Sequence, residues 1–312
     1  MDTYSGILSD IGNRIQNPSS DVKTILKTMV NAHYERAWNR YPWPEICVWD
    51  QAVTTTAGSA DLVLPKDVGV VLGLSDRTNA IALTGTAGQQ MVRGNVSTIA
   101  ITGTPYEYSD AGEVGALNQP NVTSASAIKC ISSAAADATQ TVTIWGIVSG
   151  ERQSYTVTLS GVSSATTSGV FSSVERIGVS AATAGVLTFT ANAGTVAVAT
   201  LAPNERYTRY LKLRLHYVPS TAATIYVSYK RRFAPLVNDN DYPEINVSQF
   251  LVLQAEADWL ERQGQFSKAQ AMRQEAGGAL RDAVVSKAVH SDKFAGTIPL
   301  YGRSSIDQPM GY

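Results

Sequence analysis

Few side chains in this sequence have the type and spacing that enzyme chemistry needs. The three histidines, His33, His216 and His290, fall in three separate segments, which does not favour a histidine metal site or a catalytic triad. The chain also lacks a His-Glu-X-X-His pattern and a Gly-X-Ser-X-Gly elbow. No residue receives a catalytic role, and the sequence predicts that the protein is not an enzyme.

Two stretches contain part, but not all, of the pattern of a ligand-binding loop. TGTAGQQ, residues 84–90, contains glycine but lacks the Gly-Lys-Ser/Thr of a phosphate loop, which favours a turn. NDNDYPE, residues 238–244, offers the carboxylates of Asp239 and Asp241, but lacks the Gly and closing Glu of a calcium loop. The favoured interpretation of residues 238–244 is a polar segment that leads into a helix, so the sequence predicts neither metal nor cofactor.

The basic run Lys230, Arg231 and Arg232 ends a predicted strand. Such a run is usually a solvated edge, and contact with an acidic neighbouring subunit or with DNA is the alternative interpretation. The chain as a whole is not basic, because 25 Lys and Arg face 26 Asp and Glu, for a formal net charge of -1. Sequence-independent attraction to DNA or to an anionic membrane is therefore not expected.

Three of the five tryptophans, Trp38, Trp43 and Trp49, lie within residues 30–50, VNAHYERAWNRYPWPEICVWD. Aromatic rings can stack on sugars or bases, or they can fill a core. The prolines that flank Trp43 cannot extend a helix, which places the three rings on a helix, in its break and on the following strand. We expect them to anchor that helix to a sheet, burying roughly 150 to 250 Å² each.

Composition places the chain among globular proteins, since 312 residues with 44% hydrophobic and 16% charged content can bury a substantial core. The start, MDTYSGILSD, has no signal-peptide pattern, and no apolar run is long enough to span a membrane. We expect a soluble protein made in the cytoplasm. Cys47 and Cys130 suggest neither a disulfide framework nor a metal motif.

The middle of the chain is unusually poor in charge, with six charged residues among the 84 between Pro120 and Pro203. Short strand-like runs recur there between Gly, Ser, Asn and Asp, and SYTVTLS alternates with the period of two of a half-buried strand. Residues 119–203 are therefore predicted to be an inserted antiparallel β-sandwich.

The flanking regions are mainly helical in pattern. Apolar spacing predicts helices over residues 4–15 and 20–40, and a helical hairpin from about residue 247 to 290. Gly277 and Gly278 cost the last helix roughly 1 kcal/mol each against Ala, which suggests a kink or the close approach of another backbone.

The strand-like runs between the helix break and the sandwich segment are short, and two longer ones follow the sandwich segment. RYLKLRLHYVP and ATIYVSYKRRF, joined through residues 219–223, alternate regularly and predict a hairpin with one wet face. The predicted fold class is α+β and multi-domain. Residues 1–118 and 204–290 form a helical body with a small antiparallel sheet, and residues 119–203 form the inserted all-β sandwich.

The last segment, residues 291–312, has no helical or strand period and forms an extended C-terminal tail in this prediction. It nevertheless keeps seven large apolar residues: Phe294, Ile298, Leu300, Tyr301, Ile306, Met310 and Tyr312. Apolar side chains without a common face need a partner that buries them. The tail is therefore the predicted docking element.

The order of these motifs resembles the head-to-tail adaptor, or connector, proteins of tailed bacteriophages, of the tail tubular protein A and head-completion types. The resemblance covers roughly residues 1–118 and 204–312. VNAHYERAWNRYPWPE, GTPYEYSDAGE and the strand pair ending in KRRFAPLVNDNDYPEI carry it, followed by the helical hairpin and loose tail. The segment 119–203 departs from the simpler pattern and resembles the immunoglobulin-like modules inserted in phage structural proteins.

The resemblance implies a homo-oligomeric ring, commonly a dodecamer, assembled in the host cytoplasm and incorporated in the virion neck or tail. Its helices would form the ring body, and its tail would bind the portal protein. A downstream tail or nozzle protein would be the other partner, with genomic DNA passing through the channel without sequence recognition and no membrane contact.

Two rival classes remain open. A carbohydrate-binding adhesin would use the sandwich, with Trp145 and Tyr155 stacking on sugar, and another tail structural protein is a related alternative. An enzyme such as a cell-wall hydrolase would need paired carboxylates in a cleft, and no spacing in the sequence proposes them.

Overall fold

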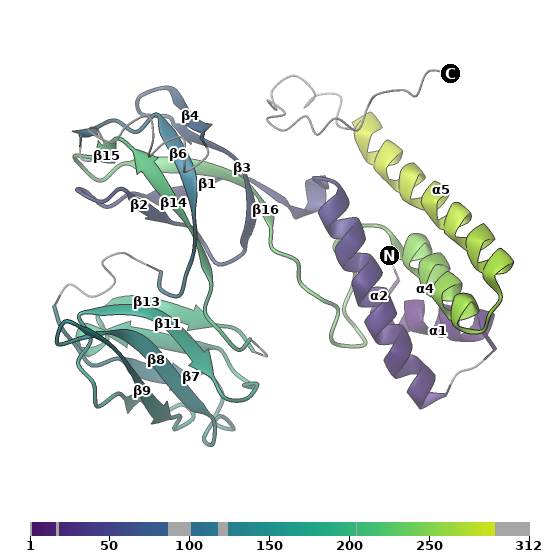
Figure 1. The fold of residues 1–312 in the computed structure, drawn as a ribbon, viewed down its shortest axis with the longest axis horizontal. Coiled ribbons are helices and arrows are strands. Elements are labelled where there is room, and N and C mark those ends of the chain that lie inside the picture. The colour runs from purple at the N-terminus through teal and green to yellow at the C-terminus, as the bar shows by residue number, and fades with distance from the viewer. Residues whose placement is uncertain (1, 17–18, 87–100, 118–123, 204, 291–312) are drawn as a thin grey trace. The chain divides into compact units, whose positions relative to one another are not determined.

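The chain divides into two compact units in the computed structural model (Figure 1). The helical unit comprises Met1–Cys47 and Phe233–Tyr312, and the β unit comprises Val48–Arg232. The structure describes residues 2–16, 19–86, 101–117, 124–203 and 205–290. Both ends of the chain thus belong to one unit, and the β unit is inserted between them in sequence.

Four helices build the described part of the helical unit: α1 (Tyr4–Arg14), α2 (Ser20–Arg40), α4 (Ser248–Arg262) and α5 (Phe266–His290). Thr3 caps α1, because its Oγ1 accepts a hydrogen bond from the Gly6 amide at 3.1 Å, and Ser19 caps α2 in the same way. Gly264, with φ of 75°, forms the turn between α4 and α5. The helices predicted from apolar spacing are confirmed.

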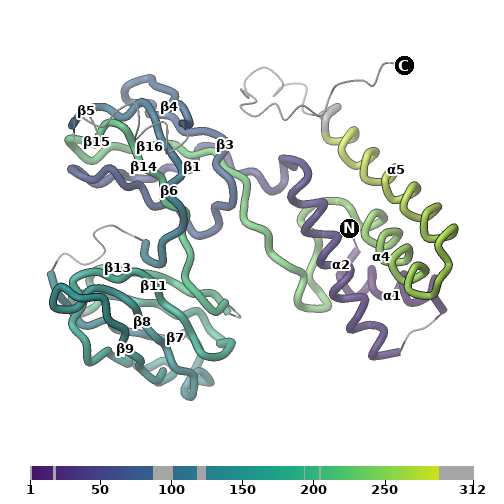
Figure 2. The backbone as a smooth tube through the Cα atoms, in the orientation of Figure 1, coloured from purple at the N-terminus to yellow at the C-terminus, as the bar shows by residue number. Residues whose placement is uncertain are grey.

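A seven-stranded sheet curled into a half barrel forms one part of the β unit. Its strands follow the spatial order β1 (Cys47–Thr54), β16 (Thr224–Arg231), β3 (Val68–Asp76), β4 (Ile81–Gly85), β6 (Glu107–Val114), β14 (Tyr210–His216) and β2 (Asp61–Val63). The β4–β6 pair is parallel, whereas β3 is antiparallel to both its neighbours. Figure 2 shows the chain entering this sheet along β1 and leaving it along the adjacent β16.

The predicted hairpin of β14 and β16 is wrong. A short element, β15 (Val218–Pro219), follows β14 and pairs with β5 (Thr102–Gly103), which separates the two long strands. As a result β14 pairs with β6 and β2, while β16 pairs with β3. The alternation of apolar residues is the same whichever strand is the partner, so the pattern could not distinguish these arrangements.

Two further sheets face a common core in the rest of the β unit. One has the order β10 (Ala165–Thr166), β7 (Lys129–Ser132), β12 (Leu187–Ala191) and β13 (Val196–Leu201); the other has β11 (Ser173–Val179), β8 (Thr141–Val148) and β9 (Glu151–Thr158). A 3-10 turn, η2 (Asn192–Gly194), connects β12 to β13. Ile144, Phe171 and Phe189 are fully buried between the sheets.

The predicted fold class, a helical body with a small sheet, is wrong because the protein is mostly β. Strands make up 37% of the chain and helices 28%, and the sheet is a curled half barrel and not a small accessory to a helical body. The sheet is larger than predicted because strands from before and after the 119–203 segment pair in it. One of them, the three-residue β2, is too short for its pattern to be recognised in the sequence. The predicted domain boundaries next to residues 118 and 204 fall outside the described ranges and stay a prediction.

Candidate functional site

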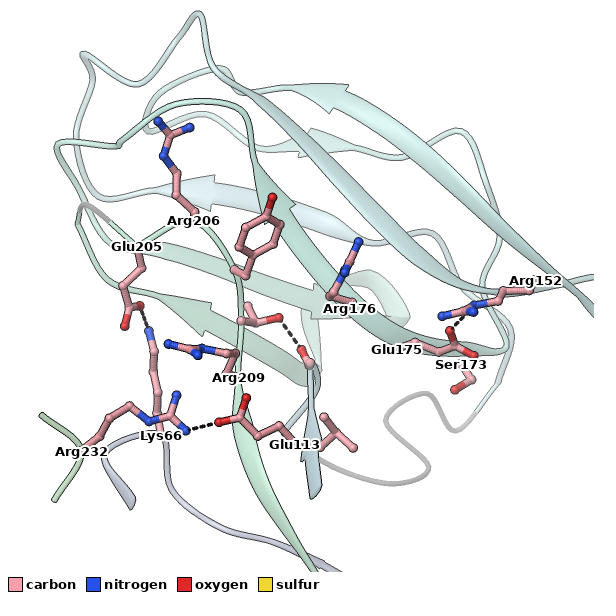
Figure 3. Close-up of a pocket in the computed structure, with 14 residues that line it drawn as sticks. Lys66, Glu113, Arg152, Ser173, Glu175, Arg176, Glu205, Arg206, Arg209 and Arg232 are labelled. Atoms are coloured by element: carbon pink, nitrogen blue, oxygen red, sulfur yellow. Dashed lines mark hydrogen bonds and ion pairs between the residues drawn. The ribbon is translucent and has the colours of Figure 1, made fainter. Parts of the chain in front are cut away.

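A pocket of about 920 Å³ opens in the β unit, beyond the end of β6 and beside β11 (Figure 3). Backbone contacts form its floor. The Gly115 amide donates to the Glu175 carbonyl at 2.9 Å, and the Thr208 hydroxyl donates to the Gly115 carbonyl at 2.7 Å. A Cβ at Gly115 would lie 2.4 Å from that Glu175 carbonyl, so this close approach requires glycine.

The pocket is lined by more basic than acidic side chains. The basic ones are Lys66, Arg152, Arg176, Arg206, Arg209 and Arg232, and the acidic ones are Glu113, Glu175 and Glu205. Each glutamate already has a basic partner, because Glu113 pairs with Arg232 at 2.9 Å, Glu175 pairs with Arg152 at 2.7 Å, and Glu205 pairs with Lys66. We call this site the arginine pocket, and these ion pairs frame it in Figure 3.

Three arginines of the arginine pocket have no carboxylate partner within the described ranges: Arg176, Arg206 and Arg209. The Arg176 guanidinium lies over the Trp145 ring, 4.2 Å from its centroid, and 5.5 Å from the Tyr207 centroid. Arg206 donates to the Ser180 carbonyl. Arg209 is exposed and makes no hydrogen bond, ion pair or ring contact in the part of the chain that the structure describes.

Strand register explains the position of Arg176. It stands directly opposite Trp145 in the antiparallel β11–β8 pair, and directly opposite residues share one face of a sheet. Tyr155, by contrast, stands opposite the buried Ile144 and packs its ring on Phe171 at 5.7 Å. The structure therefore places Trp145 and Tyr155 on opposite faces, where they form no joint platform for a sugar.

A second cavity, of about 540 Å³, lies in the helical unit between the start of α4 and the C-terminal half of α5. Its lining includes the small residues Ser248, Gly278, Ala279, Ala283 and Ser286. A Cβ at Gly278 would have no atom within 4 Å, so the surface is open there. We call this cavity the α5 groove.

The predicted basic run contributes only one residue to a candidate site. Arg232 lines the arginine pocket, whereas the Lys230 side chain is buried, with 7% of its surface exposed. The run is therefore not a continuous solvated edge.

The histidines are not brought together. His33 lies in the helical unit with its Nε2 2.8 Å from Asp258 Oδ2, and this hydrogen bond, together with Arg273, holds the pKa of Asp258 below its usual value. His216 lies in the β unit against Tyr106, and His290 ends α5. Within the described ranges no three His, Cys, Asp or Glu residues form a group that could hold a metal ion.

The Asp239 and Asp241 carboxylates stabilise the loop before α4. Asp239 pairs with Lys27 at 3.2 Å, and Asp241 accepts the amides of Val237 and Asn238, each at 2.7 Å. These amide hydrogen bonds hold the pKa of Asp241 below its usual value.

The three clustered tryptophans separate in the structure. Trp38 and Trp43 are buried in the helical core, with 1% and 2% of their surface exposed, where the Trp38 ring packs edge-on against Phe233. A 3-10 turn, η1 (Pro44–Ile46), follows Trp43. Trp49, on β1, is 45% exposed, which differs from the expectation that all three rings are buried.

The predicted docking residues lie outside the described ranges. They are Phe294, Ile298, Leu300, Tyr301, Ile306, Met310 and Tyr312. The arginine pocket was not predicted, although one signal pointed toward it: Arg152, Glu175 and Arg176 are three of only six charged residues in the 120–203 segment.

No protein-family model matches the chain, and comparison with curated proteins finds no relative. Among the described residues, no helix combines the length and apolar character that crossing a membrane demands.

Proposed function

We propose that this chain is a structural virion protein of a tailed bacteriophage, a head-to-tail adaptor whose copies form a ring beneath the portal. In this role it joins the DNA-filled head to the tail and continues the DNA channel. The order of its sequence motifs supports the proposal, as does the near-neutral charge of -1, which suits a passage that DNA must traverse without adhering.

The observation that carries the proposal is that residues 2–47 and 233–290, from the two sides of the β unit in sequence, fold into one helical unit. The Tyr4 amide donates to the Asp241 carbonyl at 2.8 Å, and Arg14 on α1 pairs with Glu256 on α4 at 3.3 Å. The last helix of this unit, α5, leads directly into the apolar segment 291–312. A ring subunit with a portal-binding tail needs this kind of firm base for the tail.

The α5 groove supplies a surface for the neighbouring copy in the ring. Two adjacent glycines in a helix interior cost roughly 1 kcal/mol each, and they are explained if a second backbone approaches closely at Gly278. The small side chains of the groove permit such an approach, and Glu275 and Asp282 in its lining offer charges for orientation.

A matched pair of variants tests this assignment. Gly278 and Gly277 are both exposed on α5, and an added Cβ at either would have no atom within 4 Å, but only Gly278 lines the groove. Gly278→Leu should fill the groove and prevent the copies from joining, whereas Gly277→Leu should not. Negative-stain images and light scattering of each variant, with and without the purified portal, would show rings for the wild type and for Gly277→Leu. If Gly278→Leu forms rings as well as the wild type does, the α5 groove is not part of the contact between copies.

A further inference from the structure

We propose that the arginine pocket binds an acidic polypeptide segment of a partner protein, through at least two closely spaced carboxylates. The proposal goes beyond ring formation, because it concerns the β unit and not the helices or the tail. Its starting point is the surplus of positive charge in the lining, where six basic side chains face three acidic ones.

No carboxylate of the β unit pairs with the three arginines that make up this surplus. Residues 87–100, 118–123 and 204, the segments of this unit outside the described ranges, contain neither Asp nor Glu in their sequence. Every acidic side chain of the β unit is therefore described, and none pairs with Arg176, Arg206 or Arg209. Their positive charge is therefore available to an acidic ligand from outside the β unit.

Arginine is well suited to bind a carboxylate. The guanidinium group is planar and presents its N–H donors as a fork that matches the two oxygens of a carboxylate. Arg176 is held in a defined orientation between Trp145 and Tyr207, so little side-chain entropy is lost when it binds. Tyr207, which is 53% exposed, adds an aromatic surface for the aliphatic part of a Glu or Asp side chain.

Nucleic acid is a weaker fit to the same pocket. Glu113, Glu175 and Glu205 interrupt the positive charge of the lining, so the pocket offers no continuous basic track for the regularly spaced phosphates of an extended backbone, whereas two carboxylates need only the arginines that have no partner.

A second copy of this chain is also a weaker fit. Most acidic side chains described in the helical unit are already engaged inside that unit. They are Asp10, Glu45, Asp239, Asp241, Glu256, Asp258 and Glu261. These contacts would have to break before a copy could present those seven carboxylates, whereas a flexible acidic segment of another protein carries no such contacts.

The test uses the full chain and a fluorescein-labelled peptide of six glutamates, with a six-glutamine peptide and a single-stranded oligonucleotide as comparison probes. Fluorescence anisotropy should detect the glutamate peptide alone, with binding that weakens as NaCl is raised. Arg209→Glu should raise the Kd at least about tenfold, because a charge-assisted hydrogen bond is lost and a repulsive charge is added. Arg209 makes no described contact, so the variant should fold normally.

The matched control is Arg214→Glu, which reverses an exposed arginine of β14 outside the pocket. It should keep the affinity of the wild type. The proposal is overturned if Arg214→Glu weakens binding as much as Arg209→Glu, or if the glutamate peptide does not bind. It is also overturned if the oligonucleotide binds more tightly, or if Arg209→Glu abolishes a salt-sensitive self-association of the chain without changing peptide binding. None of these readouts involves the portal, so this proposal and the adaptor function can fail separately.

Discussion

Trp43 donates a hydrogen bond from its indole Nε1 to the Ala37 carbonyl at 2.8 Å. This bond closes the C-terminal end of α2, where a carbonyl has no amide partner within the helix. The indole ring is 2% exposed and packs against Tyr41 at 5.7 Å between ring centroids. The tryptophan that lies in the helix break therefore caps the helix and fills the core beneath it.

Trp43→Ala should lower the free energy of unfolding by about 3 to 5 kcal/mol, because a buried aromatic ring and its hydrogen bond are both removed. Trp49→Ala is the control, since 45% of that ring is exposed, and it should cost less than about 1 kcal/mol. Urea denaturation followed by circular dichroism measures both. Similar losses for the two variants would contradict this account of the tryptophan cluster.

Asp137 organises one edge of the sandwich. Its side chain is fully buried and accepts hydrogen bonds from the Ser132 hydroxyl at 2.6 Å and from the amides of Ala184 and Gly185 at 2.8 and 2.9 Å. Asp137→Ala leaves these donors without an acceptor and should destabilise the β unit by about 1 to 3 kcal/mol or more. A smaller loss in the free energy of unfolding, measured by denaturation, would mean that water replaces the carboxylate as the hydrogen-bond acceptor at no cost in stability.

The same carboxylate should make stability depend on pH. Burial raises the pKa of Asp137, but the Ser132 hydroxyl and the two amides outweigh burial and lower it below the usual value. A lowered pKa in the folded state gives stability that is fully present above the unfolded pKa of about 3.9 and is lost as the pH falls through the folded pKa. Denaturation midpoints between about pH 6 and pH 2 should fall less steeply in Asp137→Ala than in the wild type.

Gly115→Ala should disrupt the floor of the arginine pocket. The added Cβ would lie 2.4 Å from the Glu175 carbonyl and 2.5 Å from the Arg176 Cα, so the backbone has to move, at a cost of about 1 to 3 kcal/mol. Gly73→Ala on β3 is the control, because no atom lies within 4 Å of its Cβ position. Thermal melting should separate the two variants, and equal melting temperatures would show that the floor adapts without strain.

The helical part of the fold was predictable because its signals are local. The residues Ser19 and Gly264 mark a helix start and a helix end, and the apolar spacing between such signals is long enough to be distinctive. Strand partners carry no comparable local signal. The pairing of β16 with β3 joins residues more than a hundred positions apart, and nothing in either strand specifies the other.

The arginine pocket was missed for a related reason. Lys66, Glu113, Arg176 and Arg209 come from four distant parts of the chain, and only the curled sheet and the sandwich together make them neighbours. Charge spacing along the sequence cannot show this. The scarcity of charge in the 120–203 segment was the available clue, since an Arg retained there has to be explained by its surroundings.

Attachment to heads tests the adaptor function most directly. Portal-bearing, DNA-filled heads assembled without this protein would be mixed with the full chain or with a chain ending at His290, and then imaged and assayed for DNA retention. The account predicts that the full chain adds a ring beneath the portal and retains the DNA, and that the shortened chain stays folded but does neither. Heads that gain no ring from the full chain, or that are sealed equally well by the shortened chain, would contradict it.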